Sequence, residues 1–254
     1  MTAIDSTASP ARRLEWQQAE VREIVTETFR VKSLLLRVAS WPGHFPGQHV
    51  DIRLTAEDGY QAQRSYSIAS PPEDELLALT VERVENGEVS PYLVGELRIG
   101  DRFELRGPIG GYFVWTVPTG GPLCLIAGGS GMAPLMAMLR HRDRQKAHIP
   151  GSVLYSSRSL EDVIYRNELD AMAQCDSNLR VIYTLTRKQP EEWLGPRRRI
   201  DKALLAEVCY PPDKNSKIFV CGPTSLVEEV ARMLVELGHE PQTIKTERFG
   251  PTGA

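Results

Sequence analysis

Three short motifs in this 254-residue sequence could bind phosphate and hold a flat ring. Arg64-Ser-Tyr-Ser67 offers a guanidinium fork that suits phosphate, an aromatic face and a hydroxyl. Gly128-Gly-Ser-Gly-Met-Ala-Pro134 lies between a short apolar run and a helical pattern, so its glycines would let the backbone approach a pyrophosphate at a helix start. Cys221-Gly-Pro223 ends another apolar run. Each motif is weak alone, and the information lies in their order.

In this order and spacing the motifs resemble the ferredoxin–NADP(+) reductase family of two-domain flavoenzymes, over about residues 20–250. The resemblance implies that Arg64 binds a flavin phosphate and that Tyr66 lies against the isoalloxazine and bonds the ribityl chain. It also implies that Ser67 places its hydroxyl close to the flavin ring, while Ser65 points the other way. Taken alone, these four residues are more typical of an ordinary surface strand with an Arg and a Tyr, and only the later motifs reverse this preference.

A second segment, Gly87-Glu-Val-Ser90, matches the G-x-x-S/T of the same family. The resemblance implies a short helix beneath the flavin diphosphate, with Gly87, Val89 and Ser90 at the cofactor and Ser90 near flavin N5. Pro91 suits the first turn of such a helix. A glycine-containing hairpin turn explains this segment equally well without the resemblance.

The glycine-rich turn departs from the usual G-x-G-x-x-G because Pro134 replaces the third glycine, but it matches the G-G-T/S-G-x-A-P of the family. The G-x-S-x-G nucleophile elbow of hydrolases fits less well, since Met132 occupies its last position and only His239 follows His148 as a histidine. The resemblance implies nucleotide contacts from Gly129, Ser130, Gly131, Met132 and Pro134.

The resemblance also places Cys221 opposite the nicotinamide C4 as a positioning group, with Gly222 and Pro223 beside it. Glu247 and Phe249 match a carboxylate two residues before an aromatic ring that covers the flavin. Phe replaces the terminal Tyr of plant-type members, and residues 250–254 follow it, so a gating ring and a tail that reaches the adenine side of the flavin are both open. The expected catalytic residues are Ser67, Ser90, Cys221 and Glu247.

A hydroxyl and a guanidinium follow two expected strands of the second half. Thr186-Arg187 stands where the family binds the 2′-phosphate of NADP, and Ser157-Arg158 is a further candidate. No acidic residue lies at either strand end, although Glu161 and Asp162 come soon after the first. The sequence therefore favours NADPH over NADH. Arg197-Arg-Arg199 is either an additional phosphate contact or a solvated basic loop.

Composition narrows the possible partners. The net charge of -3 gives no reason to expect nucleic acid or an anionic membrane. No apolar run approaches the length of a membrane span, and residues 1–20 lack the apolar core of a secretory signal. The four cysteines form no C-x-x-C, so we expect a reduced, cytoplasmic chain without an iron–sulfur cluster of its own. His44 and His49 do not have the spacing of a metal site.

The pattern of expected secondary structure divides the chain into two parts. Strand-like alternation and turn residues recur from residue 20 to about 117, which predicts an antiparallel barrel or sandwich. After the linker Pro118-Thr-Gly-Gly-Pro122, strands alternate with helices, which predicts a doubly wound parallel sheet. We expect a flexible arm over 1–17, an FAD-binding barrel over 18–118 and an NAD(P)-binding α/β domain over 119–254. In the second half, helices are expected over 132–145, 163–172, 201–208 and 225–237, and a last strand over 243–246.

The resemblance therefore implies an oxidoreductase that passes a hydride from NAD(P)H to bound FAD and hands single electrons to ferredoxin or a similar carrier. One alternative is a reductase component that serves an oxygenase or a cytochrome P450. Another is a flavin-binding electron-transfer subunit without catalysis of its own. A basic helix end, Arg140-His-Arg-Asp-Arg-Gln-Lys146, suits the negative end of the helix dipole or a docking patch for an acidic carrier.

Overall fold

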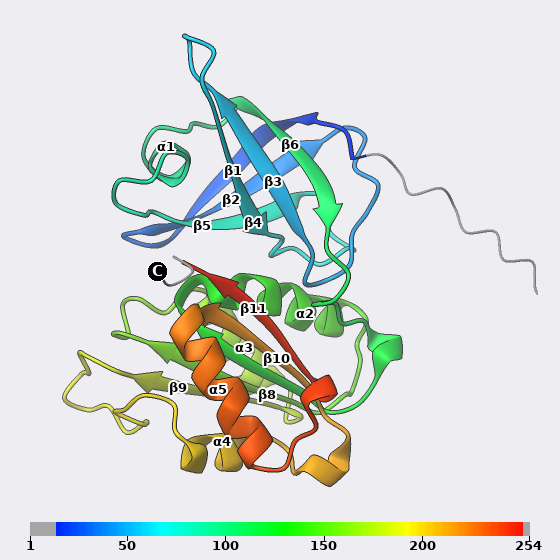
Figure 1. Cartoon of the computed structure of the whole chain (residues 1–254), viewed down its shortest axis with the longest axis vertical. Helices are drawn as coiled ribbons and strands as arrows, with labels where there is room; N and C mark the ends of the chain where they lie inside the picture. Colours follow the sequence, from blue (N-terminus) through cyan, green and yellow to red (C-terminus); the bar gives the residue numbers. More distant parts are fainter. Residues whose placement is uncertain (1–13, 251–254) are drawn as a thin grey trace, which may run out of the picture.

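Alternating apolar residues build six antiparallel strands in the first half of the computed structural model, which describes residues 14–250 (Figure 1). The order in the sheet is β4-β3-β6-β1-β2-β5. Ile68, just past β4, forms an isolated bridge with Leu79 of β5, so the two outer strands meet and the sheet curls into a barrel. The strands are β1 (Gln17–Thr28), β2 (Val31–Val38), β3 (His49–Thr55), β4 (Gln61–Ser67), β5 (Leu77–Glu82) and β6 (Arg102–Ile109).

The period of two along β2 shows how the barrel is filled. Leu34 and Leu36 are fully buried inside it, while Leu35 between them packs against the core of the other half of the molecule. Helix α1 (Ser90–Gly95) adds Leu93 and Val94 to the barrel core. Pro91 lies in its first turn, as the sequence indicates.

Five parallel strands in the order β11-β10-β7-β8-β9 form the second half. Leu123 and Leu125 face one side of this sheet with α2 and α3, and Cys124 and Ile126 face the other side with α4 and α5. A doubly wound sheet is therefore confirmed. Its strands are β7 (Leu123–Gly128), β8 (Gly151–Ser157), β9 (Leu179–Leu185), β10 (Lys217–Pro223) and β11 (Ile244–Phe249). Its helices are α2 (Met132–Arg144), α3 (Arg166–Cys175), α4 (Lys202–Val208) and α5 (Thr224–Glu236).

Two elements end three residues later than the sequence analysis predicts, namely α3 at Cys175 instead of residue 172 and the last strand at Phe249 instead of residue 246. Helix α3 begins at Arg166 instead of residue 163, because Tyr165 adopts a left-handed conformation with φ of 58° that a helix cannot include. The last strand starts at Ile244 after a short 3₁₀ turn and continues to Phe249. Of the arm expected over 1–17, residues 1–13 lie outside the described part of the chain, and Gln17 already belongs to β1.

The two halves share a packed boundary, along which α2 lies in Figure 1. Val31, Ala69 and Ala78 of the barrel belong to the same buried cluster as Met132 and Leu135 of α2. Burial of apolar surface from both halves in one cluster favours a fixed relative position.

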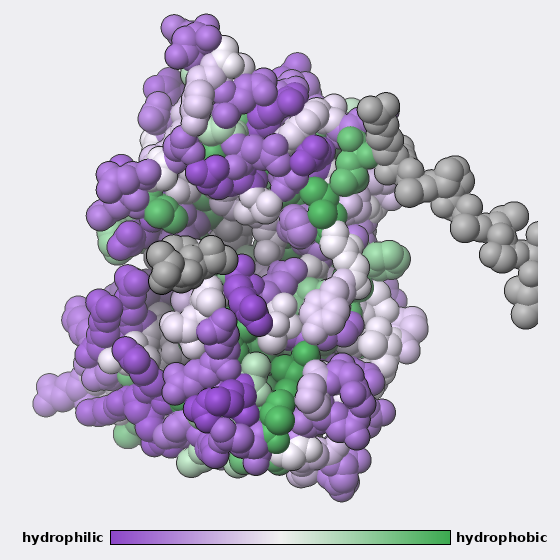
Figure 2. Space-filling model, viewed as in Figure 1, coloured by the Kyte–Doolittle hydropathy of each residue, from purple (hydrophilic) through white to green (hydrophobic). Residues whose placement is uncertain are grey.

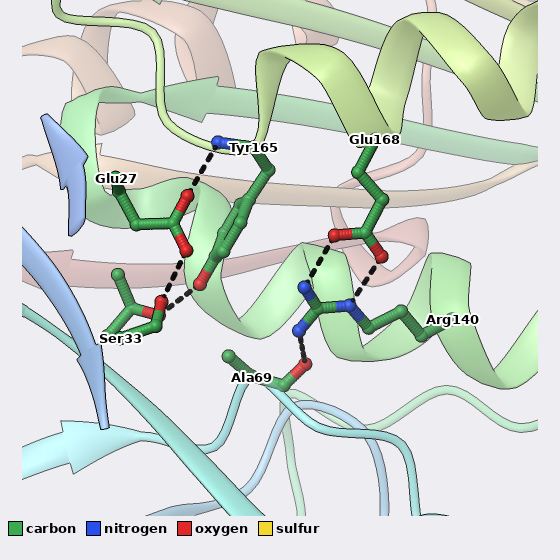
Figure 3. A network of polar contacts seen from close by, with 7 residues as sticks. Glu27, Ser33, Ala69, Arg140, Tyr165 and Glu168 are labelled. Carbon is green, nitrogen blue, oxygen red and sulfur yellow. Dashed lines mark hydrogen bonds and ion pairs between the residues drawn. The ribbon is translucent and has the colours of Figure 1, made fainter. Parts of the chain in front are cut away.

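Polar contacts cross this boundary beside the shared core (Figure 3). The Thr80 hydroxyl of the barrel hydrogen-bonds the Tyr165 phenol, and the Tyr165 backbone N–H donates to Glu27 at 3.3 Å. Arg140 of α2 makes a two-pronged ion pair with Glu168 at 2.6 and 2.8 Å and donates to the Ala69 carbonyl at 2.9 Å. These contacts hold the end of α2 and the start of α3 against the barrel.

The basic end of α2 is thus largely engaged within the chain. Besides Arg140, Arg142 pairs with Asp176 at 2.6 Å and Arg144 pairs with Asp74 at 3.0 Å. These pairs leave little free charge at the segment that the sequence offered as a docking patch. The face shown in Figure 2 is mainly hydrophilic, with hydrophobic residues visible in small separate areas. Within residues 14–250, every helix is too short or too polar to cross a bilayer.

Candidate functional site

The glycine turn and the C-G-P segment meet where the strand order of the parallel sheet reverses. Strand β7 lies between β8 and β10, and the carboxyl ends of β7 and β10 carry the two motifs. A Cβ on Gly131 would lie 2.3 Å from the Cys221 carbonyl oxygen, so only glycine fits there. Gly222 in turn lies against Gly128. Crevices at such a reversal are the usual ligand sites of open α/β sheets.

A cavity of ≈ 240 Å³ opens at this point and has walls from both halves of the molecule. It brings together residues from five of the segments that the sequence analysis singled out, although they lie far apart in the chain. Of the expected cofactor contacts, it is lined by Gly129, Ser130, Ser157, Arg158, Thr186, Pro223 and Phe249.

The geometry of the turn fits a phosphate group. Gly129 has a φ of +55°, and the position of a Cβ on it has no atom within 4 Å, so backbone faces open space. The Ser130 hydroxyl donates to Glu82 of β5 at 2.8 Å. The Tyr155 phenol supports the turn by donating to the Gly129 carbonyl at 3.0 Å. Met132 and Pro134 are buried in α2 behind the turn and do not line the cavity.

Cys221 and Glu247 lie opposite each other on neighbouring strands β10 and β11. The Cys221 side chain is almost completely buried, and burial together with the nearby carboxylate raises the pKa of its thiol. The thiol therefore stays protonated and positions a ligand better than it attacks one. Burial also raises the pKa of Glu247 to about 7. A carboxyl that titrates near neutrality next to a ligand cavity is a candidate functional group.

The expected flavin contacts lie on β4, the outer strand of the barrel. Arg64 is exposed and pairs with Glu88 at 2.6 Å. Tyr66 packs against the barrel core, and burial raises the pKa of its phenol to about 12. Ser67 pairs with His49 of β3, and Ser65 donates instead to Asp51 at 2.6 Å.

These groups fit the parts of a flavin in type. The aromatic ring and the Ser67 hydroxyl come from one strand, and the Arg64 guanidinium is held by an exposed carboxylate that a phosphate would replace.

The second flavin segment is joined to the barrel and does not line the cavity. Val89 is buried in the barrel core, and the Ser90 hydroxyl accepts a hydrogen bond from the Val84 N–H at 3.0 Å. A Cβ on Gly87 would lie 3.1 Å from the Ser90 oxygen, which explains a small residue there. The contacts of Ser90 thus run to the loop before α1.

The ends of β8 and β9 bring their candidate phosphate ligands side by side. The Thr186 N–H and hydroxyl both donate to the Ser157 carbonyl, at 2.9 and 3.1 Å, and the Arg187 N–H donates to the Arg158 carbonyl at 2.9 Å. Arg187 itself is exposed and is not part of the cavity wall. Arg197 donates to the Trp193 carbonyl and Arg198 pairs with Asp201, so two arginines of the basic loop are engaged locally.

The sequence analysis missed the barrel side of the cavity. Thr28, Arg30 and Val31 come from the turn between β1 and β2, and Glu82 ends β5. No motif marks these residues, because only the packing of the two halves brings them to the glycine turn. A charged residue at a hairpin tip is too common in sequences to have served as a signal.

Both halves of the chain match known protein families. Residues 19–114 match the oxidoreductase FAD-binding domain, and residues 125–232 match the oxidoreductase NAD-binding domain. The chain is 31% identical to the glycine betaine monooxygenase reductase subunit of Chromohalobacter salexigens, over 91% of this chain and 64% of that one. It is 31% identical to NADH-cytochrome b5 reductase 1 of Eremothecium gossypii, over 76% of this chain and 68% of the relative.

The fold is likewise that of a solved enzyme. The structure of a cytochrome P450 reductase from Amycolatopsis superimposes with a TM-score of 0.81 and 26% identity, covering 94% of this chain and 71% of that one. The chain spans about 64% of the length of the glycine betaine monooxygenase reductase subunit.

Proposed function

Because this chain belongs to the ferredoxin–NADP(+) reductase-like family of FAD- and NAD(P)H-binding oxidoreductases, we propose that it passes electrons from NAD(P)H through bound FAD to a one-electron protein acceptor. The observation that carries the proposal is the cavity at the sheet reversal. It joins the phosphate-type turn, the end of β11 with Phe249 and a wall of the flavin-type barrel in one place.

Each half supplies separate groups to this reaction. Gly129 and Ser130 would hold the nucleotide pyrophosphate, and Cys221 would fix the ring that lies over it. Tyr66 and Ser67 would bind the flavin from β4. The bound cofactors supply the hydride transfer and the division into single electrons.

Glu247 is the group of this site that can hold or release a proton near neutral pH, since its pKa is about 7. Its position opposite Cys221, on the strand next to β10, would put that proton beside the nicotinamide side of the site. The almost completely buried thiol excludes water from the same corner. Ser90 would support the flavin through the loop before α1.

Of the two nucleotides, we propose NADPH. Arg158 and Arg187 leave β8 and β9 side by side, and within the described residues neither forms an ion pair, so both guanidinium groups are available to a 2′-phosphate. We expect Arg187→Ala to weaken binding of NADP(+) and NADPH about tenfold and binding of NAD(+) and NADH little. Loss of one charge-assisted contact weakens binding by about this factor. Titration of the oxidised protein with NADP(+) and NAD(+) measures both constants. Equal losses for the two nucleotides would remove the assignment.

For the acceptor, we propose the iron–sulfur or haem protein of an oxygenase system. The relatives that support this class are named as a monooxygenase reductase subunit and a cytochrome P450 reductase. A stand-alone ferredoxin is the second candidate acceptor, and it needs the same reduced flavin.

The test of the catalytic half is anaerobic titration of the flavin-loaded protein with NADPH and with NADH. We expect stoichiometric bleaching of the flavin absorbance, faster with NADPH. Flavin that stays oxidised with both nucleotides would support the non-catalytic subunit instead. A preparation that binds no flavin would exclude both functions.

The test of the acceptor uses the reduced protein. Its rates of electron transfer to a purified ferredoxin, to a cytochrome and to free flavin are compared by stopped-flow absorbance. We expect a protein carrier to be reduced faster than free flavin. Preference for free flavin would identify a flavin reductase and contradict the proposed protein acceptor.

A further inference from the structure

The cavity at the sheet reversal has one wall that belongs to the barrel. Thr28, Arg30, Val31 and Glu82 face the glycine turn from that side, although the barrel is the flavin-type half. The proposed function assigns no role to these residues.

Hydrogen bonds show how close this wall is to the turn. Glu82 accepts from the Ser130 hydroxyl at 2.8 Å, so β5 touches the turn directly. Val31 pairs with Glu82 across β2 and β5, and the Arg83 N–H donates to the Arg30 carbonyl at 2.8 Å. Arg30 is therefore anchored beside the residue that contacts the turn.

The charges of the cavity wall are unequally satisfied. Its two carboxylates have donors, since Ser130 donates to Glu82 and Ser159 donates to Asp162 at 2.8 Å. Within residues 14–250, Arg30 makes no ion pair. Its guanidinium has only a long contact of 3.5 Å to the Arg83 carbonyl and lies 5.8 Å from the Phe29 ring centre. A half-buried guanidinium held this weakly suits an anionic ligand.

We propose that Arg30 contacts the pyrophosphate of bound NAD(P)H from the barrel side, as a positioning residue; this rests on the function proposed above. The pyrophosphate is the anion that a nucleotide places at the glycine turn. The 2′-phosphate is expected at the ends of β8 and β9, on the other wall. The nucleotide is then held between the two halves, and its binding is coupled to the seam where the flavin lies.

The experiment measures dissociation constants of NAD(+), NADP(+) and ADP-ribose for the flavin-loaded full chain. It compares Arg30→Ala with the wild type and with Arg37→Ala, which removes an exposed arginine at the far end of the same hairpin. We expect Arg30→Ala to weaken all three ligands by a similar factor, about tenfold, because all three carry a pyrophosphate. Arg37→Ala should leave them unchanged, and Arg30→Lys should restore part of the loss.

Salt separates a direct contact from a structural effect. The difference between wild type and Arg30→Ala should shrink as ionic strength rises, because it comes from a charge on a phosphate. Flavin content and unfolding midpoint should match the wild type. If Arg30→Ala does not fold, the same dissociation constants are measured for Arg30→Gln, with the same expected loss.

Unchanged affinities, a loss confined to NADP(+), or a loss that does not depend on salt would overturn the inference. These outcomes differ from failure of the proposed function. If the proposed function failed, neither nucleotide would reduce the flavin of the wild type. If only the inference about Arg30 failed, the wild type would still be reduced and the variants alone would not behave as expected.

Discussion

Glu247 combines two properties that single residues of the site rarely share. It lies opposite Cys221 on the neighbouring strand, and burial raises its pKa to about 7. At neutral pH both charge states are populated, so a small change in its surroundings shifts the proton. Gly131 contributes no side chain, and its backbone lies directly against the backbone of Cys221. Both residues depend on the close approach of β7, β10 and β11.

The raised pKa of Glu247 predicts a pH-dependent stability. The native state binds the proton more tightly than the unfolded chain, so this contribution is full below the ordinary pKa of 4.5 and is lost as pH rises through about 7. Relative to the wild type, Glu247→Gln should therefore gain about 1 kcal/mol between about pH 5 and pH 8, after allowance for solvent screening. Urea unfolding across this range measures the difference. The exposed Glu228→Gln on α5 is the control and should show no such trend.

The contact at Gly131 predicts a large cost for a single methyl group. Gly131→Ala would place a Cβ 2.3 Å from the Cys221 carbonyl oxygen, so β10 or the turn must move. We expect a loss of about 2–4 kcal/mol in the free energy of unfolding and loss of nucleotide binding. Gly95→Ala, at a position with no atom within 4 Å, should cost less than about 0.5 kcal/mol. Similar stabilities of the two variants would show that the turn tolerates a side chain.

The elements at the seam depend on the segment before α3. Tyr165 adopts a left-handed conformation there, and its backbone and phenol are bound by Glu27 and Thr80 of the barrel. A strained conformation persists only where its surroundings hold it. The barrel strands thus determine where α3 begins, and α3 in turn supplies Glu168 to Arg140 of α2. The sequence periodicity alone placed the helix start three residues too early for this reason.

Removing one hydroxyl tests this dependence. Tyr165→Phe keeps the ring in the shared core and deletes the hydrogen bond to Thr80, which should lower the free energy of unfolding by about 1 kcal/mol. Tyr60→Phe removes an exposed phenol that donates to Glu88 and should change stability by less than about 0.5 kcal/mol. Chemical unfolding of both variants provides the comparison. If Tyr165→Phe left the free energy of unfolding unchanged, the shared apolar core would hold the two halves together without a contribution from the hydrogen bond to Thr80.

At the scale of the whole molecule, the main feature is one buried core that both halves share. The cluster that contains α2 also contains Val31, Ala69 and Ala78 of the barrel, so neither half has a complete core when separated. The ligand cavity crosses the same boundary, with the glycine turn on one side and the β1–β2 turn on the other. Binding a nucleotide and keeping the halves together therefore involve neighbouring contacts.

This arrangement predicts cooperative unfolding of the flavin-loaded protein. Trp115 lies in the shared core, whereas Trp41 packs against the barrel core. We expect fluorescence and far-ultraviolet circular dichroism to give coincident transitions in urea with one midpoint. Nucleotide at a hundredfold excess over its dissociation constant should raise the free energy of unfolding by about 3 kcal/mol and shift both transitions together. Variants with either tryptophan replaced by phenylalanine assign the signals. Two separated transitions would contradict the shared core.

The two sheets, their order in the chain and the turn at Gly128-Gly-Ser-Gly131 could be predicted from residue patterns, because strand periodicity and glycine requirements are local. The sequence also predicted Thr186, Arg158 and Phe249 as cofactor contacts, and these residues line one cavity of the structure because their segments end neighbouring strands. The barrel wall with Arg30 and Glu82, the start of α3 and the environment of Glu247 became visible only in the folded chain. The barrel wall and the start of α3 depend on contacts between residues 48 and 138 positions apart, and the environment of Glu247 depends on the pairing of β11 with β10, none of which local patterns encode.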